Sequence, residues 1–187
     1  KILRKKINKF RSNPIRKEVL VDSLMMLHEM RISTYPKYVV TAKINKAMDM
    51  MTYAAKGEEQ EVFNVLGDAM ETAKGKTAVV IPVRYMSYAN DLYKAGSMSA
   101  EEVMAAYNKA YSTAELIEKV KPSQSITDAK KDIENLLMIS GVASCENLVE
   151  MFTPRFEANR TDKYMLGNLI SMFSASNCLD EDLFMLA

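Results

Sequence analysis

The breaks between the amphipathic stretches of this chain are very short, and this feature most constrains its fold. Apolar residues recur at helical spacing through stretches of roughly 15–20 residues, and no stretch alternates as a half-buried strand does. Polar turns of about two to four residues join these stretches, and helices joined by such turns must run antiparallel. The sequence therefore predicts an all-α fold of antiparallel helix pairs.

Turn-forming residues set the expected helix limits. Asn13-Pro14 begins one helix because Pro suits the first helical turn. Ser99 and Glu102 form a capping box at the start of another, and Gly141 suits the left-handed residue after a helix. Pro82 and Pro154 fall inside expected helices, where proline kinks the backbone. The expected helices cover residues 1–12, 14–34, 37–56, 58–74, 76–95, 99–121, 125–140, 144–158, 161–176 and 177 onward.

Residue periodicity also predicts which faces are buried. In the helix 14–34, the side chains of Val19, Leu20, Leu24, Leu27 and Met30 follow one side, which we expect to face the core. Gly67 and Gly167 lie inside expected helices, where Gly costs about 1 kcal/mol relative to Ala. Close approach of a neighbouring helix would explain both.

Helices begin near residues 58, 99, 145 and 179, at intervals of roughly 34–46 residues, which is the period of helix-pair repeat proteins. No composition shift marks a domain boundary. We therefore expect residues 1–187 to form a single helical-repeat domain, a right-handed α-α superhelix (solenoid). The array looks open at both ends, as a fragment of a longer protein would.

Charge excludes some classes of partner. The formal net charge is +1, so no global field steers the chain to nucleic acid or to an anionic membrane. Residues 1–17 carry eight Lys and Arg and no acid, with Leu3, Ile7 and Phe10 on one helical face. This segment fits either a membrane or nucleic-acid contact or the exposed back of a terminal helix, and its clean apolar stripe favours the second interpretation. No stretch has the ~18 apolar residues of a membrane span.

Two sets of residues carry a family resemblance. The segment Tyr164-x-Leu166-Gly167-x-x-Ile170 is similar to the Leu-Gly-x-x-Tyr core of a tetratricopeptide repeat. More of the chain resembles a group of bacterial cell-envelope proteins with divergent tetratricopeptide-like repeats, through segments 24–31, 76–82, 141–148 and 152–159. The resemblance implies an all-α superhelix without catalytic activity, export to the cell envelope or periplasm, and a protein or peptide partner. Export is not established, and the cytoplasm stays open as a location.

The histidine and cysteines permit several interpretations. His28 is the one histidine of the sequence, and one His cannot build a zinc site, which needs about four ligands. A dyad with Cys145 or Cys178 has no support from spacing, so we expect a partly exposed helical His. Both cysteines begin expected helices at the same end of the array. Given the implied export, they fit a disulfide or two small buried thiols.

Other motifs are explained by helix chemistry. Carboxylates gather at residues 58–61, 101–102 and 180–182, in first helical turns, where the helix dipole favours anions. The segment Lys74-Gly-Lys76-Thr77 lacks the first glycine and the strand of a phosphate-binding loop. We therefore expect neither a metal nor a cofactor.

Methionine and tyrosine supply the remaining candidates. Six methionines cluster on two neighbouring helices, and we favour a core role for them over a partner-binding surface: Met25, Met26, Met30, Met48, Met50 and Met51. If the helix 76–95 lines a groove, Arg84, Tyr85 and Tyr88 are the best available binding anchors, because Arg and Tyr combine contact area with polar groups. Ordinary packing between helices is the alternative for them.

We therefore predict a non-catalytic scaffold that binds a protein or peptide. The alternatives are a helical enzyme or regulatory domain whose site the sequence does not reveal, and nucleic-acid binding through the basic N-terminal helix.

Overall fold

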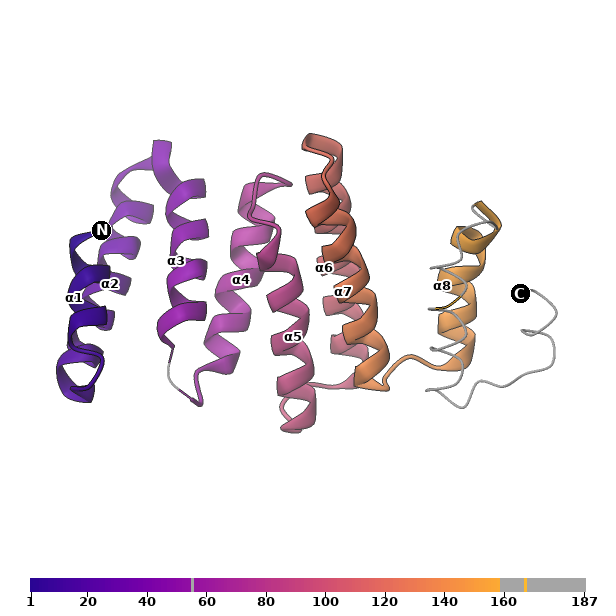
Figure 1. The fold of residues 1–187 in the computed structure, drawn as a ribbon, viewed down its shortest axis with the longest axis horizontal. Helices are drawn as coiled ribbons and strands as arrows, with labels where there is room; N and C mark the ends of the chain where they lie inside the picture. The colour runs from indigo at the N-terminus through magenta and orange to yellow at the C-terminus, as the bar shows by residue number, and fades with distance from the viewer. Residues whose placement is uncertain (55, 159–166, 168–187) are drawn as a thin grey trace.

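The computed structural model describes residues 1–54, 56–158 and 167 of the chain, and within these residues it is helical without any strand. The helices lie side by side in a row from α1 to α8 (Figure 1). They are α1 (Ile2–Lys9), α2 (Pro14–Thr34), the short 3-10 helix η1 (Pro36–Tyr38), α3 (Val39–Tyr53), α4 (Glu59–Ala73), α5 (Val80–Lys94), α6 (Ala100–Val120), α7 (Gln124–Ser140) and α8 (Cys145–Ala158). The all-α prediction is confirmed, and the superhelical arrangement stays a prediction.

The capping residues act as the sequence predicts. The Asn13 side chain accepts a hydrogen bond from the Arg16 backbone N–H at 3.1 Å at the start of α2. Ser99 and Glu102 form a reciprocal capping box on α6. Gly141 ends α7 with a φ of 68°. The helices expected at 161–176 and from 177 onward fall outside the described residues, apart from Gly167, which is helical.

The two prolines differ in their placement. α5 begins at Val80, four residues later than the sequence indicates, so Pro82 lies in the first turn. A backbone N–H there has no partner within its own helix, so Pro82 removes no hydrogen bond from α5, and the expected kink has no cause. Pro154 does lie inside α8, as expected.

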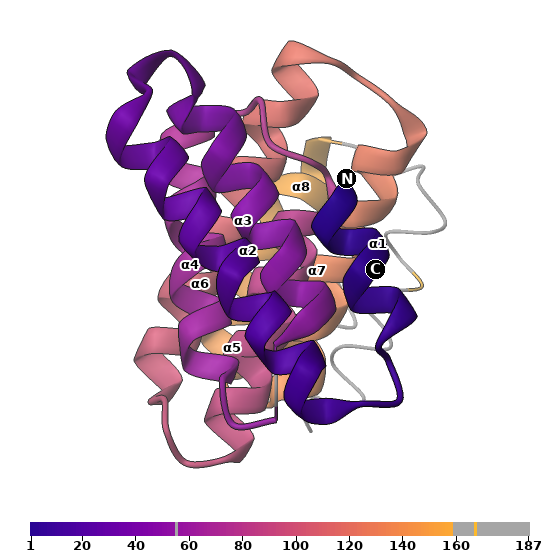
Figure 2. The same ribbon diagram turned by 90° about the vertical axis from the view of Figure 1, so that its left-hand side faces the viewer.

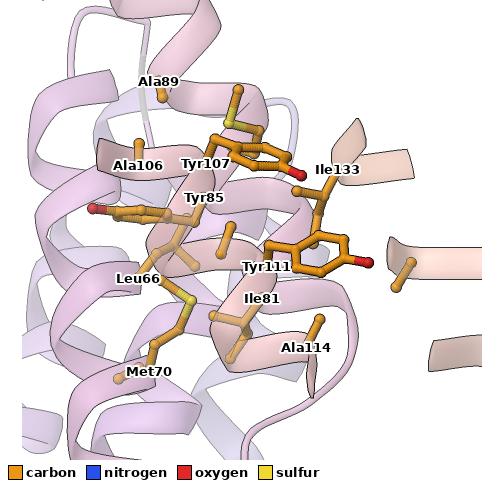
Figure 3. Packing of buried hydrophobic residues seen from close by; sticks show 14 of the residues in the cluster. Leu66, Met70, Ile81, Tyr85, Ala89, Ala106, Tyr107, Tyr111, Ala114 and Ile133 are labelled. Carbon is orange, nitrogen blue, oxygen red and sulfur yellow. The ribbon is translucent and has the colours of Figure 1, made fainter. Parts of the chain in front are cut away.

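The centre of the molecule is an apolar core in which small and large side chains alternate (Figure 3). Each α-helix from α1 to α6 packs against the next α-helix along the chain, and α5 also packs against α7. The Asn90 side chain connects α5 to α7 by donating to the Leu136 carbonyl at 2.6 Å. Buried alanines allow the helices to approach closely: Ala69, Ala73, Ala89, Ala106, Ala110 and Ala114.

Gly67 illustrates this close packing. A Cβ added at Gly67 would lie 3.2 Å from the Tyr85 ring and 3.3 Å from the Lys109 amine, so the helical glycine makes room for a side chain of α5. The close approach predicted from the sequence is confirmed at Gly67, whereas a Cβ added at Gly167 would meet no described atom within 4 Å.

The N-terminal end of the row, which faces the viewer in Figure 2, buries fewer of its apolar side chains than the sequence predicts. Ile7 of α1 is buried, as a packed terminal helix requires. α2 buries Leu24 and His28, but Val19, Leu27 and Met30 are 59%, 45% and 57% exposed. The prediction that all these apolar residues share a buried side is therefore wrong. Apolar residues surround most of α2, so only part of them can face the core.

Candidate functional site

Two adjoining hollows make a groove along α2, α3 and α4, which we call the α2–α4 groove. Their volumes are about 540 and 380 Å³, and they share Glu29 and Lys46 in their walls. The groove is lined by Asp22, Met25, Met26, Glu29, Met30, Ile32, Ser33, Lys43, Lys46, Glu61, Asn64, Val65 and Asp68. α2 and α4 supply most of these residues, and α3 supplies the two lysines.

The methionines divide between the core and this groove. Met50 of α3 is 4% exposed, and Met48 and Met51 pack against the core. Met26 and Met30 of α2 are 68% and 57% exposed and line the groove. The core interpretation is therefore right for α3 and wrong for these two methionines of α2. A flexible, polarisable side chain on a surface adapts to the shape of a bound partner.

The charges of the groove are partly neutralised within it. Lys46 donates to Glu29 at 2.5 Å, and Lys43 donates to Asp68 at 2.7 Å. Asp22 and Glu61, both exposed, have no ion-pair partner among the described residues. The groove thus offers apolar area together with an excess of negative charge.

The anchors predicted on α5 have different environments. Arg84 is exposed and Tyr88 is half-buried, one turn apart on the same face. Tyr85 is 6% exposed and stacks on Phe63 at 4.2 Å between ring centroids. The structure therefore brings Arg84 and Tyr88 together at the surface and places the Tyr85 ring in the packing of α4 and α5. A binding role for these residues stays a prediction.

Burial changes the acidity of Tyr85. Removal from water disfavours the phenolate, and the negative charge of Glu71 adds to this effect, so the pKa of Tyr85 rises to about 12. Lys109 lies 5.5 Å from the centre of the same ring and donates to Glu71. In Figure 3 the Tyr85 hydroxyl points away from Tyr107 and Tyr111.

A buried ionic cluster near α1 was missed by sequence reasoning. Asp49 of α3, 4% exposed, accepts two hydrogen bonds from Arg4, from Nε at 2.7 Å and from Nη2 at 2.8 Å. His28 Nε2 lies 2.7 Å from the second Asp49 oxygen. His28 is itself 4% exposed, so the prediction of a partly exposed histidine is wrong. No local motif marks these residues, which come from three different helices.

The cluster holds Asp49 in its charged form. Burial acts to raise the pKa of Asp49, but the hydrogen bonds from His28 and Arg4, with the positive charge of Arg4, outweigh it and place the pKa below its ordinary value. The Arg4 pKa is raised, chiefly by its hydrogen bonds to Asp49. Because Asp49 is a carboxylate, the proton of the shared hydrogen bond belongs to His28 Nε2.

The remaining predicted residues lie at the other end of the row. Cys145 is the first residue of α8, far from α2 (Figure 1), so it does not form a dyad with His28. Cys178 falls outside the described residues, and the disulfide stays a prediction. In the described part of the chain, no three His, Cys, Asp or Glu side chains gather to hold a metal ion. No described helix has the length and apolar character to cross a membrane.

Comparison with known proteins identifies no relative: no protein-family model, curated protein or solved structure matches this chain.

Proposed function

We propose that this protein is a non-catalytic helical-repeat scaffold, and that the α2–α4 groove binds a peptide segment of a partner protein. The observation that carries the proposal is the groove itself, with exposed Met26 and Met30 beside Asp22 and Glu61, which have no ion-pair partner among the residues described. Exposed apolar groups lose contact with water when a partner covers them, which is the main driving force for such association.

The negative charge of the groove favours a basic partner segment. The carboxylates of Asp22 and Glu61 favour Lys or Arg on the bound segment, whereas Lys43 and Lys46 are already paired with acids of the groove. We expect a segment with apolar side chains flanked by basic ones. A peptide of this kind would place its apolar groups against Met26 and Met30 and its cations against Asp22 and Glu61.

The catalytic alternative has less support. His28 and Asp49 have the geometry of a histidine oriented by a carboxylate, which in enzymes activates a nucleophile at the other ring nitrogen. That nitrogen, Nδ1, is buried without a hydrogen-bond partner among the described residues. Placement in the bacterial cell envelope and assignment to tetratricopeptide-like repeats rest on the sequence resemblance alone.

A peptide selection tests the proposal. A random peptide library displayed on phage is selected on the purified protein, and enriched peptides are titrated against the wild type, Met26→Glu/Met30→Glu and Ile139→Glu. Ile139 is a matched control because it is 66% exposed on α7, outside the groove. We expect basic, apolar peptides, with binding weakened at least about tenfold by the groove double variant and unchanged by Ile139→Glu.

Methyl NMR locates the bound peptide. The methyl resonances of Met26 and Met30 should shift on titration, whereas that of Met86, which is fully buried, should not. Enrichment of no peptide, or equal affinity of the wild type and the groove variant, would contradict the proposal. Loss of binding in Arg84→Ala alone would move the site to the anchors predicted on α5.

A further inference from the structure

We infer that a second hollow, between α1, α2 and α3, is a binding site for a small organic anion that carries a carboxylate or phosphate on an apolar body. We call it the His28 hollow. Its volume is about 480 Å³, within the range of small-molecule sites. It shares no lining residue with the α2–α4 groove, so it does not depend on the function proposed for that groove.

The charge of the lining is positive. Lys1, Arg4 and Arg31 line the hollow, and no Asp or Glu of the described ranges does. The nearby acid, Asp49, is already bound by Arg4 and His28. Arg31 contacts the Tyr38 ring, 5.8 Å from its centre, and has no carboxylate partner among the described residues. Positive charge that the fold itself does not neutralise attracts an anion.

His28 supplies a buried polar side chain to the wall of the hollow. It lines the hollow, is 4% exposed, and its Nδ1 is buried with no hydrogen-bond partner in the part of the chain that the structure describes. A buried polar atom without a partner is costly, so a ligand that supplies the partner is favoured. With Nε2 bound to Asp49, Nδ1 accepts a hydrogen bond from an acid O–H, or donates one to an oxyanion when the imidazole carries a second proton. Both states suit a carboxylic or phosphoric acid group.

Apart from Asn45 of α3, the rest of the lining is apolar. It consists of Ile2, Leu3, Leu24 and Leu27. Leu27 is 45% exposed and lies one turn before Arg31, so apolar area adjoins a cation. Inorganic phosphate would leave these groups in contact with water, whereas an anion with a short hydrocarbon part would cover them. The lining therefore selects an amphiphilic anion over a simple ion.

The single histidine makes the test direct. Octanoate, octyl phosphate, inorganic phosphate and octylamine are titrated separately into the whole protein, and the imidazole resonances, which belong to His28 alone, are followed by NMR. We expect octanoate or octyl phosphate to shift these resonances with a Kd of about 1 mM or tighter. Octylamine should produce no shift, and inorganic phosphate should bind more weakly than either amphiphile. Added salt should weaken binding of the anions.

A variant pair separates binding from structure. Arg31→Gln removes an exposed cation that takes no part in the Asp49 cluster, and we expect it to weaken octanoate or octyl phosphate binding about tenfold while the protein stays folded. Lys119→Gln, which removes a cation that is also exposed but lies on α6, should leave binding unchanged. The inference is overturned if neither amphiphilic anion moves the imidazole resonances, if octylamine moves them equally, or if Arg31→Gln binds like the wild type. Circular dichroism of both variants verifies folding.

Discussion

The centre and the N-terminal end of this molecule bury different kinds of residue. From α4 to α7 the buried side chains are mostly alanine, branched aliphatic residues and tyrosine, and the buried polar ones, Thr77, Asn90 and Thr113, are uncharged. From α1 to α3 the interior holds the charged Asp49 and its partner His28. Most of the exposed large apolar side chains also lie in this end, before residue 41.

We expect the centre of the molecule to supply most of the folding stability and the N-terminal end to supply the binding surfaces. Apolar burial is the main source of folding free energy, and the centre has most of it. The N-terminal end places charge inside and apolar groups outside, an arrangement that adds little stability and creates surfaces able to bind. Both candidate sites, the α2–α4 groove and the His28 hollow, lie in this end or at its border with α4.

The largest expected effect is in the central core. Leu66 is fully buried on α4, so Leu66→Ala should lower the free energy of unfolding by about 3 kcal/mol through lost burial and a residual cavity. Leu27→Ala, at a residue 45% exposed on α2, should cost less than about 1 kcal/mol. Urea denaturation measures both. Equal costs would show that the two regions do not differ in the way we describe.

The next effect tests the ionic cluster. Asp49→Asn leaves Arg4 and His28 without their carboxylate and should destabilise the protein by about 2 kcal/mol, less than a fully buried pair because Arg4 is partly exposed. Asp68→Asn breaks a more exposed pair with Lys43 and should cost less than about 1 kcal/mol.

The stability difference between the wild type and Asp49→Asn should depend on pH. The pKa of Asp49 is lower in the folded state than its ordinary value, so its contribution to stability is present above that ordinary value and is lost as the pH falls through the lowered one. The wild type should therefore lose its advantage over Asp49→Asn between about pH 5 and pH 2. Denaturation across this range checks the sign. A constant difference would mean that Asp49 does not titrate as its contacts require.

A smaller effect concerns the turn after α4. Gly75 has a φ of 82°, and an added Cβ would lie 2.8 Å from the Leu116 carbonyl oxygen of α6. Gly96 has a φ of 73°, and a Cβ added there would meet no described atom within 4 Å. Both Gly→Ala variants should lose about 1 kcal/mol from backbone strain, and Gly75→Ala should lose roughly 1 kcal/mol more from the clash. Thermal or urea unfolding of the two variants gives the difference directly, and matching values would remove the clash as a cause.

The smallest effect is spectroscopic. The difference in tyrosinate absorbance between the wild type and Tyr85→Phe, recorded during alkaline titration, should rise with a midpoint near pH 12 while the protein remains folded. A midpoint near the ordinary phenol pKa of about 10 would show that the ring is not buried between α4 and α5.

Local signals in the sequence located most of the helices. Helix caps bond to backbone groups no more than about one turn away, so the sequence alone predicts them. Examples are Asn13-Pro14, the Ser99-Glu102 capping box and Gly141. The α2–α4 groove and the ionic cluster could not be found in this way. Arg4 and Asp49 are 45 positions apart and meet only because α1, α2 and α3 pack together. Met26 and Met30 are exposed because they lie on the side of α2 that the neighbouring helices do not cover. The sequence does not show which side that is.

The contact between Gly75 and α6 has a practical consequence for engineering. The turn between α4 and α5 rests on the backbone of a third helix, so extra residues placed there would push α4 and α6 apart. A Cβ added at Gly96 would meet no described atom within 4 Å and the residue is exposed, so a fluorescent label or an affinity tag inserted at that position should leave the packing of the helices intact.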